Sequence, residues 1–177
     1  MLSDLKPTTE TLISSISKTI WKQFGATIDM FENAIVMCPD EFWGKPQFWY
    51  KSFHASFWLD YYLTVKPDGF SPPAPFTTSE FVADGKLPER KYTKEEVLTY
   101  IQASRKKLHD IMKNMTEEIA LGRWINPERD FSYFEMLLYN MRHLQHHTAQ
   151  LNLLLRQGIN NAPSWVPQTD LSLENKD

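Results

Sequence analysis

The apolar residues of this 177-residue chain recur at intervals of three and four over long stretches, and this spacing constrains the fold more than any other feature. Such spacing places the apolar side chains on one face of an α-helix. Between positions 8 and 37 the series is Leu12, Ile13, Ile16, Ile20, Phe24, Ile28, Phe31 and Ile35. Gly25 lies inside this predicted helix and marks a bend or a close contact. Pro39 and Pro46 disfavour its continuation.

A second helix is predicted over residues 47–64, QFWYKSFHASFWLDYYLT, which are aromatic nearly all round and are therefore expected at the centre of the fold. A β-strand is the alternative, because aromatic residues favour sheets. The length of the segment and its lack of strict alternation favour the helix.

The connection over residues 66–92 is rich in proline, which forbids a regular element through most of it. A loop of this length inside a compact domain is usually functional or mobile. Phe70, Phe76 and Phe81 indicate that it packs on the body of the protein. The sequence does not reveal its role.

Two further helices are predicted to begin with a capping box, in which Ser or Thr is followed three residues later by Glu. The third begins at Thr93, with Glu96, and the fourth begins near Ser132, with Glu135. Four long helices with one long crossover predict an all-α protein, a four-helix bundle with a Pro-rich crossover between its second and third helices.

The fourth helix is predicted to run to about Gln157 and to end at Gly158, a residue type that often ends helices. The tail that follows is irregular, with Trp165 expected to pin it down and the last residues expected to fray. We expect one domain over residues 1–177, with a core at about 18–157, an N-terminal helical extension and this C-terminal tail.

Composition narrows the class of protein. The formal net charge is −3 and no run of Lys or Arg is dense enough for a nucleic-acid surface. The one cysteine, Cys38, excludes an intrachain disulfide and gives no sign of secretion. No apolar stretch approaches the roughly 18–20 residues of a membrane helix, and the first residues lack the pattern of a signal peptide. We therefore expect a soluble, cytoplasmic protein.

The segment RHLQHHTAQ places three histidines close together on the fourth helix. At about 100° per residue, His143 and His147 share the apolar face, whereas His146 falls on its flank toward solvent or a neighbouring chain. An i, i+4 histidine pair is a standard way for one helix to hold a transition metal. The alternative is two core-edge histidines that hydrogen-bond to carbonyls or carboxylates.

His54 is the candidate third ligand, because it lies on the aromatic second helix among Tyr50, Trp58 and Tyr61. A lone histidine there is otherwise a hydrogen-bonded core residue. If the second and fourth helices are neighbours, His54, His143 and His147 can meet. Three imidazoles leave coordination positions open, as in a catalytic metal site.

Three more residues are candidates for a supporting role. Gln150 lies beside the histidines and could orient a ligand, or else tie helices together as a buried amide. Tyr139 and Tyr61 could donate hydrogen bonds to a substrate, although packing in the core is the simpler interpretation. No residue can be assigned a catalytic role from the sequence.

These residues resemble the signature of the DinB/YfiT-like family of four-helix metalloenzymes: a histidine early in the second helix and an HxxxHxxQ pattern on the last. The matches are His54 and the set His143, His147 and Gln150. The resemblance implies a divalent metal, most often nickel or zinc. It also implies a small-molecule substrate, a low-molecular-weight thiol in those members that are S-transferases, and in many members a homodimer. The chain departs from the family pattern at Ala149, where Gly is common.

Two functions from different classes remain open at this stage. The first is a metal-dependent enzyme, a thiol transferase or a hydrolase, in which the metal acts as a Lewis acid or lowers the pKa of a bound water or thiol. The second is a non-catalytic dimeric helical module that binds a ligand or a partner. Neutral imidazoles suit Zn, Ni, Cu or Fe, and the spacing cannot choose among them.

Overall fold

The computed structural model describes residues 9–82 and 87–174, with side chains from Leu12 onward. Four long helices dominate this part of the chain: α1 (Thr9–Met37), α3 (Pro46–Leu63), α4 (Lys94–Lys113) and α6 (Tyr133–Ile159). The shorter elements are α2 (Asp40–Trp43), the 3-10 turn η1 (Ser79–Phe81), α5 (Glu117–Leu121), β1 (Arg123–Asn126) and β2 (Arg129–Ser132). The chain is mostly helical, as predicted, with one small antiparallel sheet of β1 and β2 that was not.

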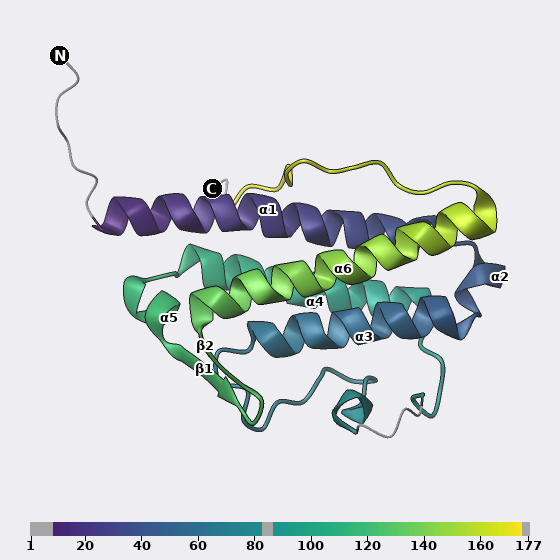
Figure 1. Cartoon of the computed structure of the whole chain (residues 1–177), viewed down its shortest axis with the longest axis horizontal. Coiled ribbons are helices and arrows are strands. Elements are labelled where there is room, and N and C mark those ends of the chain that lie inside the picture. The colour runs from purple at the N-terminus through teal and green to yellow at the C-terminus, as the bar shows by residue number, and fades with distance from the viewer. Residues whose placement is uncertain (1–8, 83–86, 175–177) are drawn as a thin grey trace, which may run out of the picture.

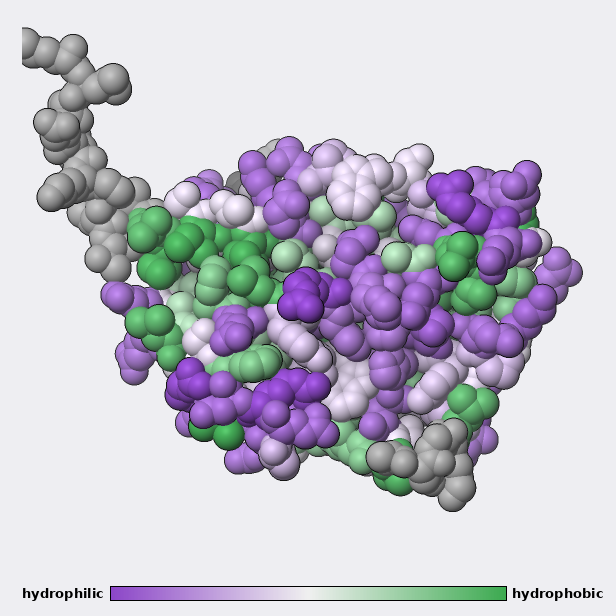
Figure 2. Space-filling model, viewed as in Figure 1, coloured by the Kyte–Doolittle hydropathy of each residue, from purple (hydrophilic) through white to green (hydrophobic). Residues whose placement is uncertain are grey.

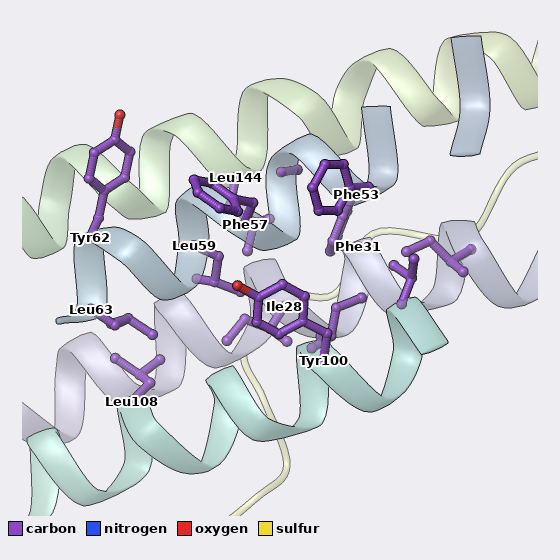
Figure 3. Close-up of a cluster of buried hydrophobic side chains, with 14 of the residues drawn as sticks. Ile28, Phe31, Phe53, Phe57, Leu59, Tyr62, Leu63, Tyr100, Leu108 and Leu144 are labelled. Atoms are coloured by element: carbon purple, nitrogen blue, oxygen red, sulfur yellow. The ribbon is translucent and has the colours of Figure 1, made fainter. Parts of the chain in front are cut away.

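The four long helices lie side by side, with α1 and α3 each packed against both α4 and α6 (Figure 1). The core between them is apolar and strongly aromatic (Figure 3). All four helices contribute to it: α1 through Ile28 and Phe31, α3 through Phe53 and Phe57, α4 through Tyr100 and Leu108, and α6 through Leu144. The aromatic second segment is therefore a buried helix, as its composition predicts, and it faces α6 directly.

Capping explains where two of the long helices begin. The Thr93 side chain accepts from the Glu96 main-chain N–H at 3.2 Å, and the Glu96 carboxylate accepts from the Thr93 N–H at 2.8 Å. This reciprocal pair confirms the predicted capping box at the start of α4. At the start of α6, the Ser132 hydroxyl accepts from the Glu135 N–H at 3.2 Å.

The predicted end of the last helix was wrong. Helix α6 continues through Gly158 to Ile159, and Asn160, with φ of 52°, is the left-handed residue that ends it. Gly158 serves instead as a point of close packing. A Cβ at that position would lie 2.6 Å from the ring of Phe42, so only glycine lets α2 approach α6 so closely.

The prediction that Trp165 pins the tail was also wrong, because its side chain is 69% exposed. The tail is held further along, where the Thr169 N–H donates to the Lys22 carbonyl at 3.0 Å. The indole N–H of Trp21 donates to the Leu171 carbonyl at 2.7 Å. Hydrogen bonds between α1 and the main chain of the tail thus hold the tail in place of the expected anchor. The predicted fraying falls mostly on residues 175–177, which lie outside the described residues.

Gly25 is a close contact rather than a bend. A Cβ at Gly25 would lie 2.5 Å from Cγ2 of Thr169, so the tail runs directly over this position of α1. The contact explains a glycine in the middle of a long helix, where it is otherwise unfavourable.

The long loop between α3 and α4 packs on the body, as its aromatic residues predict. The buried ring of Phe76 stacks on Tyr100 with 4.5 Å between ring centroids. The rings of Phe70 and Phe81 lie 5.5 and 5.0 Å from that of Phe57 on α3. The loop therefore covers the side of α3 that carries His54.

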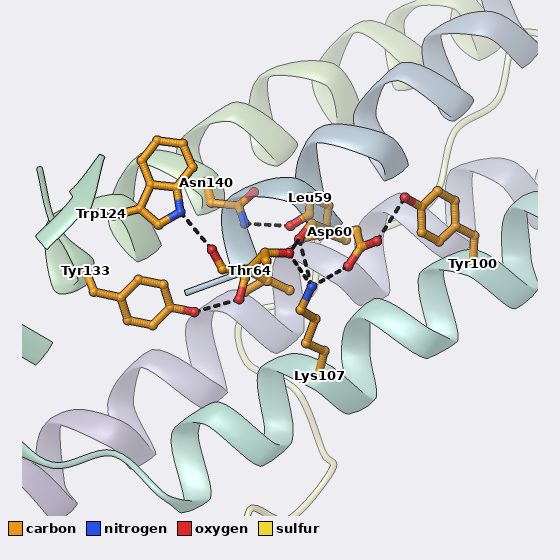
Figure 4. A network of polar contacts seen from close by, with 9 residues as sticks. Leu59, Asp60, Thr64, Tyr100, Lys107, Trp124, Tyr133 and Asn140 are labelled. Carbon is orange, nitrogen blue, oxygen red and sulfur yellow. Dashed lines mark hydrogen bonds and ion pairs between the residues drawn. The ribbon is translucent and has the colours of Figure 1, made fainter. Parts of the chain in front are cut away.

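Polar side chains from other elements hold the end of α3 (Figure 4). Three side chains donate to main-chain carbonyls here. Trp124 donates to that of Thr64 at 2.9 Å, and Tyr133 donates to that of Leu63 at 2.8 Å. Asn140 donates to that of Leu59 at 2.9 Å. Asp60 and Lys107 add an ion pair of 2.7 Å between α3 and α4. The last carbonyls of a helix lack partners within the helix, so these bonds fix how α3 sits against its neighbours.

The surface seen in Figure 2 is largely hydrophilic, with apolar area gathered toward the beginning of α1. Some large apolar side chains are exposed elsewhere, among them Leu153 and Trp165. None of the helices in the described part of the chain combines the length and the apolarity needed to cross a lipid bilayer.

Candidate metal centre

The three histidines singled out in the sequence converge. His54 on α3 lies with its ring centroid 5.6 Å from that of His143 and 4.7 Å from that of His147, both on α6. One ring nitrogen from each histidine can be chosen so that all three lie within 4.8 Å of one another. The contact between α3 and α6, which the sequence could only suppose, brings these side chains together.

The spacing of the ring nitrogens fits a transition metal. Nε2 of His143 and Nε2 of His147 lie 3.1 Å apart. Two nitrogens bound to tetrahedral zinc at ~2.0–2.1 Å would lie roughly 3.3 Å apart. The pair could therefore take up an ion between them with little movement. Neutral imidazoles are the donor set that suits zinc and nickel.

Two of the three rings are oriented by a hydrogen bond on their outer nitrogen. Nδ1 of His54 lies 2.5 Å from Oε2 of Glu80, and Nδ1 of His147 lies 3.0 Å from Oε1 of Gln150. A bond at Nδ1 leaves the Nε2 lone pair directed inward, which is how protein ligands to metals are commonly held. Nδ1 of His143 is buried without a hydrogen-bond partner among the described residues.

Glu80 is a site residue that the sequence analysis missed. Its side chain is only 4% exposed, and the oxygen that bonds His54 also accepts from the indole N–H of Trp58 at 3.2 Å. Glu80 lies in η1, within the Pro-rich loop. The sequence gives only an indirect signal for it. Phe76 and Phe81 were expected to pack on the body of the protein, and Glu80, which lies between them in the sequence, must then lie close to the body as well.

The electrostatics of the site favour neutral imidazoles. Burial, followed by the repulsion between the ring charges of His143, His147 and His54, lowers the pKa of His143 to about 3. Burial and the proximity of His54 lower the pKa of His147 to about 4. Both rings are therefore neutral near pH 7, so no proton has to leave before either nitrogen can bind a metal.

A cavity of about 670 Å³ opens beside the triad. His54 and His143 form part of its wall, together with Glu80 and the residues that follow α3. The two predicted tyrosines, Tyr61 and Tyr139, also line it. Such a volume suits a small organic molecule.

The hairpin of β1 and β2 adds Arg129 to the cavity wall, and the sequence analysis missed this residue as well. Its Nη2 donates to the Tyr139 hydroxyl at 3.2 Å. The turn is shaped by the Asn126 side chain, whose Oδ1 accepts from the Arg129 N–H at 2.8 Å. The signal was available in RWINPERDFS, where Asn-Pro lies between two runs with strand-forming residues.

The other residues considered in the sequence, His146, Ala149 and Cys38, lie outside the triad. His146 is exposed on the flank of α6, and its Nε2 lies 2.9 Å from the Gln150 amide nitrogen. Ala149 is exposed, so its methyl group lies on the outer face of α6. Cys38 is buried, and burial raises the pKa of its thiol to about 11.

The fold and the site together define a helical protein with a histidine triad that could hold a metal ion at the wall of a cavity. A family model described as the DinB family matches residues 79–165, which agrees with the resemblance carried by the histidine pattern. No curated protein and no solved structure was found to match it. The matched segment includes His143 and His147 but not His54, so the position of His54 is an independent observation.

Proposed function

We propose that this protein is a divalent-metal-dependent enzyme of the DinB type that acts on a small molecule, as a transferase or a hydrolase. The observation that carries the proposal is the convergence of three imidazoles from two helices, two of them held neutral, beside a cavity. A structural zinc site is usually closed by four protein ligands, whereas three protein ligands leave a position for water or substrate.

His54, His143 and His147 would hold the metal through their Nε2 atoms, with zinc or nickel as the proposed ion. When bound, a divalent ion supplies Lewis acidity and lowers the pKa of a water or thiol that it binds. Glu80 and Gln150 keep the rings of His54 and His147 in place from outside. The long loop and the hairpin both contribute residues to the wall of the cavity.

The tyrosines give the cavity its hydrogen-bonding groups. The Tyr139 hydroxyl accepts from Arg129, which leaves its own proton free to be donated to a substrate. Tyr61 lies deeper and is 7% exposed. A low-molecular-weight thiol is the proposed co-substrate in the transferase version of the reaction, and water takes its place in the hydrolase version.

We further propose that residues 1–177 form one domain, a four-helix bundle in which the loop between α3 and α4 is the crossover. A homodimer through the outer face of α6 is supported by exposed apolar side chains there and on the adjoining tail, Leu138, Leu153 and Trp165, which are 36, 55 and 69% exposed. A cytoplasmic location remains part of this proposal. The same exposed apolar side chains support the second candidate function, a non-catalytic interaction module.

The experiment is elemental analysis of protein purified without a histidine tag. One equivalent of zinc or nickel is expected in the wild type and in His146→Ala, and much less in His54→Ala and His147→Ala. His146 is the matched control because it is exposed on the same helix. A wild-type protein that takes up no metal after incubation with either ion would contradict the enzyme proposal and favour the interaction module.

Activity is the second arm of the test. Transfer reactions with several small thiols, and hydrolysis of a panel of amides and esters, should be measured with and without a chelator. Loss of turnover with chelator, restored by added metal, is expected. Turnover that chelation leaves unchanged would exclude a metal mechanism.

A further inference from the structure

We propose that the cavity beside the triad recognises an anionic group on a small organic substrate with an aromatic or otherwise flat apolar body, and that Arg129 is the residue that selects the anion. The proposal names the substrate class of the same site and so rests on the proposed function.

The wall of the cavity is largely aromatic. It contains the side chains of Trp58, Tyr61, Tyr62, Phe70, Phe81 and Tyr139. Several of these rings lie edge to face, as in Tyr61 with Phe81 at 5.1 Å and Tyr62 with Tyr139 at 5.3 Å between centroids, and Trp58 stacks on Tyr62. Rings packed in this way form a rigid apolar surface, against which a flat apolar body buries area at small entropic cost.

Arg129 is the cationic side chain of this wall. Its guanidinium carbon lies 5.2 Å from the ring centroid of Tyr139 and 5.9 Å from that of Tyr62, and its side chain is 23% exposed. A guanidinium carries five N–H donors. Among the described residues, its hydrogen bonds go to the Tyr139 hydroxyl and to Glu128, whose side chain is 74% exposed. Donors therefore remain for a ligand.

The charge balance of the site calls for an anion. Imidazole binds a metal in its neutral form, so three histidine ligands leave the charge of a bound divalent ion uncompensated. Arg129 adds a second centre of positive charge at the same cavity, and Glu80 compensates only part of the total. Asp68 and Glu128 lie in the wall too, but both are exposed, so water and salt screen their effect.

Tyr62 links the two positive centres. Its ring lies 5.8 Å from that of His143 and under the guanidinium of Arg129, so one aromatic layer separates the triad from the arginine. An anionic group that enters the cavity beside this ring is therefore expected to lie close to both centres. The planar fork of arginine suits a carboxylate or a similar oxyanion, which it can hold with two parallel hydrogen bonds.

The test is calorimetric titration of metal-free and zinc-loaded protein with phenylacetate and with its uncharged analogue phenylacetamide. The variants are Arg129→Gln and, with the charge kept but the fork removed, Arg129→Lys. Arg123→Gln is the matched control, because Arg123 lies on the same hairpin, pairs with Asp130 at the surface and is absent from the cavity wall. Circular dichroism verifies that each variant is folded.

In metal-free wild type we expect phenylacetate to bind about 10- to 100-fold more tightly than phenylacetamide, the range of a charge-assisted hydrogen bond. The ratio of the two affinities should fall to about one in Arg129→Gln and should keep its wild-type value in Arg123→Gln. In Arg129→Lys it should lie between these two values. Should Arg129→Gln fail to fold, the reduced preference of Arg129→Lys relative to Arg123→Gln decides the question.

Equal binding of the two compounds to metal-free wild type would overturn the proposal, as would no detectable binding of phenylacetate or a preference that Arg129→Gln retains. A preference present only in zinc-loaded protein and unchanged in Arg129→Gln would assign the selection to the metal alone. If the triad binds no zinc, the proposed function fails, while the metal-free titrations still decide the role of Arg129.

Discussion

At the scale of single residues, the site depends on side chains that touch the histidines from outside. Glu80 holds Nδ1 of His54 and is itself nearly buried, so it is well placed to set which nitrogen of the ring carries the proton. It acts through His54 and is a positioning residue. The chain also offers an exposed acid in the same loop, Glu89, as a comparison.

Glu80→Gln is expected to weaken zinc binding about 10- to 100-fold, because the amide keeps the shape of the side chain but loses the charge that orients and polarises His54. Competition with a chelator of known affinity measures the effect. Glu89→Gln should bind zinc as the wild type does. Equal affinities of the two variants would show that Glu80 has no part in holding the ligand.

The metal-free protein should lose stability in acid because of His143. In the unfolded chain this residue takes up a proton below its ordinary pKa of 6.5, whereas in the folded protein its pKa is about 3. The unfolded state therefore binds more protons between these values, and stability falls as the pH drops below 6.5. Between pH 7 and pH 5 the loss should reach up to about 2 kcal/mol.

Urea unfolding of metal-free protein at pH 7 and pH 5 measures this loss. In His143→Asn, which cannot take up a proton at this position, the free energy of unfolding should differ less between the two pH values than in the wild type. In the control His146→Asn the difference should equal that of the wild type. A pH dependence that His143→Asn leaves intact would assign the acid sensitivity to other groups.

At the scale of elements, glycines and one tryptophan decide how the secondary structure fits together. The tail crosses α1 at Gly25, where a side chain would overlap Thr169. Gly25→Ala is expected to cost about 1–3 kcal/mol of folding free energy in spite of the better helix propensity of alanine, because it forces the tail away. The free energy of unfolding and amide exchange near Leu171 are the measurements.

A second change tests whether overlap is the cause. In the double variant Gly25→Ala with Thr169→Gly, the loss of the Thr169 side chain makes room for the new Cβ, and the tail should return to its place. If the double variant is less stable than the sum of the two single changes implies, direct overlap is not the reason for the glycine.

The hairpin of β1 and β2 is anchored by Trp124, which is fully buried and donates to the Thr64 carbonyl at 2.9 Å. Trp124→Ala is expected to lower the free energy of unfolding by about 3–5 kcal/mol. Trp165→Ala should change it by less than about 0.5 kcal/mol, because that side chain is 69% exposed. Denaturant unfolding of the two variants provides the comparison, and similar losses would contradict the roles assigned to these residues.

At the scale of the whole molecule, a metal bound between α3 and α6 would link two helices that are far apart in sequence. A ligand that binds only the folded state stabilises it by about 2.7 kcal/mol at 100 times its dissociation constant. For a chain of this size we expect zinc to raise the melting temperature by about 5–10 °C. The shift should vanish with chelator and in His147→Ala. A melting temperature that is independent of zinc would count against the site.

Much of the secondary structure follows from local physics that the sequence carries. The period of apolar residues predicts α1 and α3 to within a few residues, because an amphipathic face depends only on the order of residues along the chain. The capping box at Thr93 is likewise a local arrangement of hydrogen bonds. The i, i+4 placement of His143 and His147 is fixed by the geometry of a single helix.

The tertiary structure decided everything that depends on which segments meet. The anchoring of the tail away from Trp165 and the meeting of His54 with the α6 pair both require contacts between distant residues. Glu80 and Arg129 enter the site from a loop and a hairpin, whose paths are set by packing on α3. The spacing of apolar residues carries no information about contacts between distant segments. The sequence alone therefore determined the long helices and the types of ligand, and only the packing of the chain decided the site.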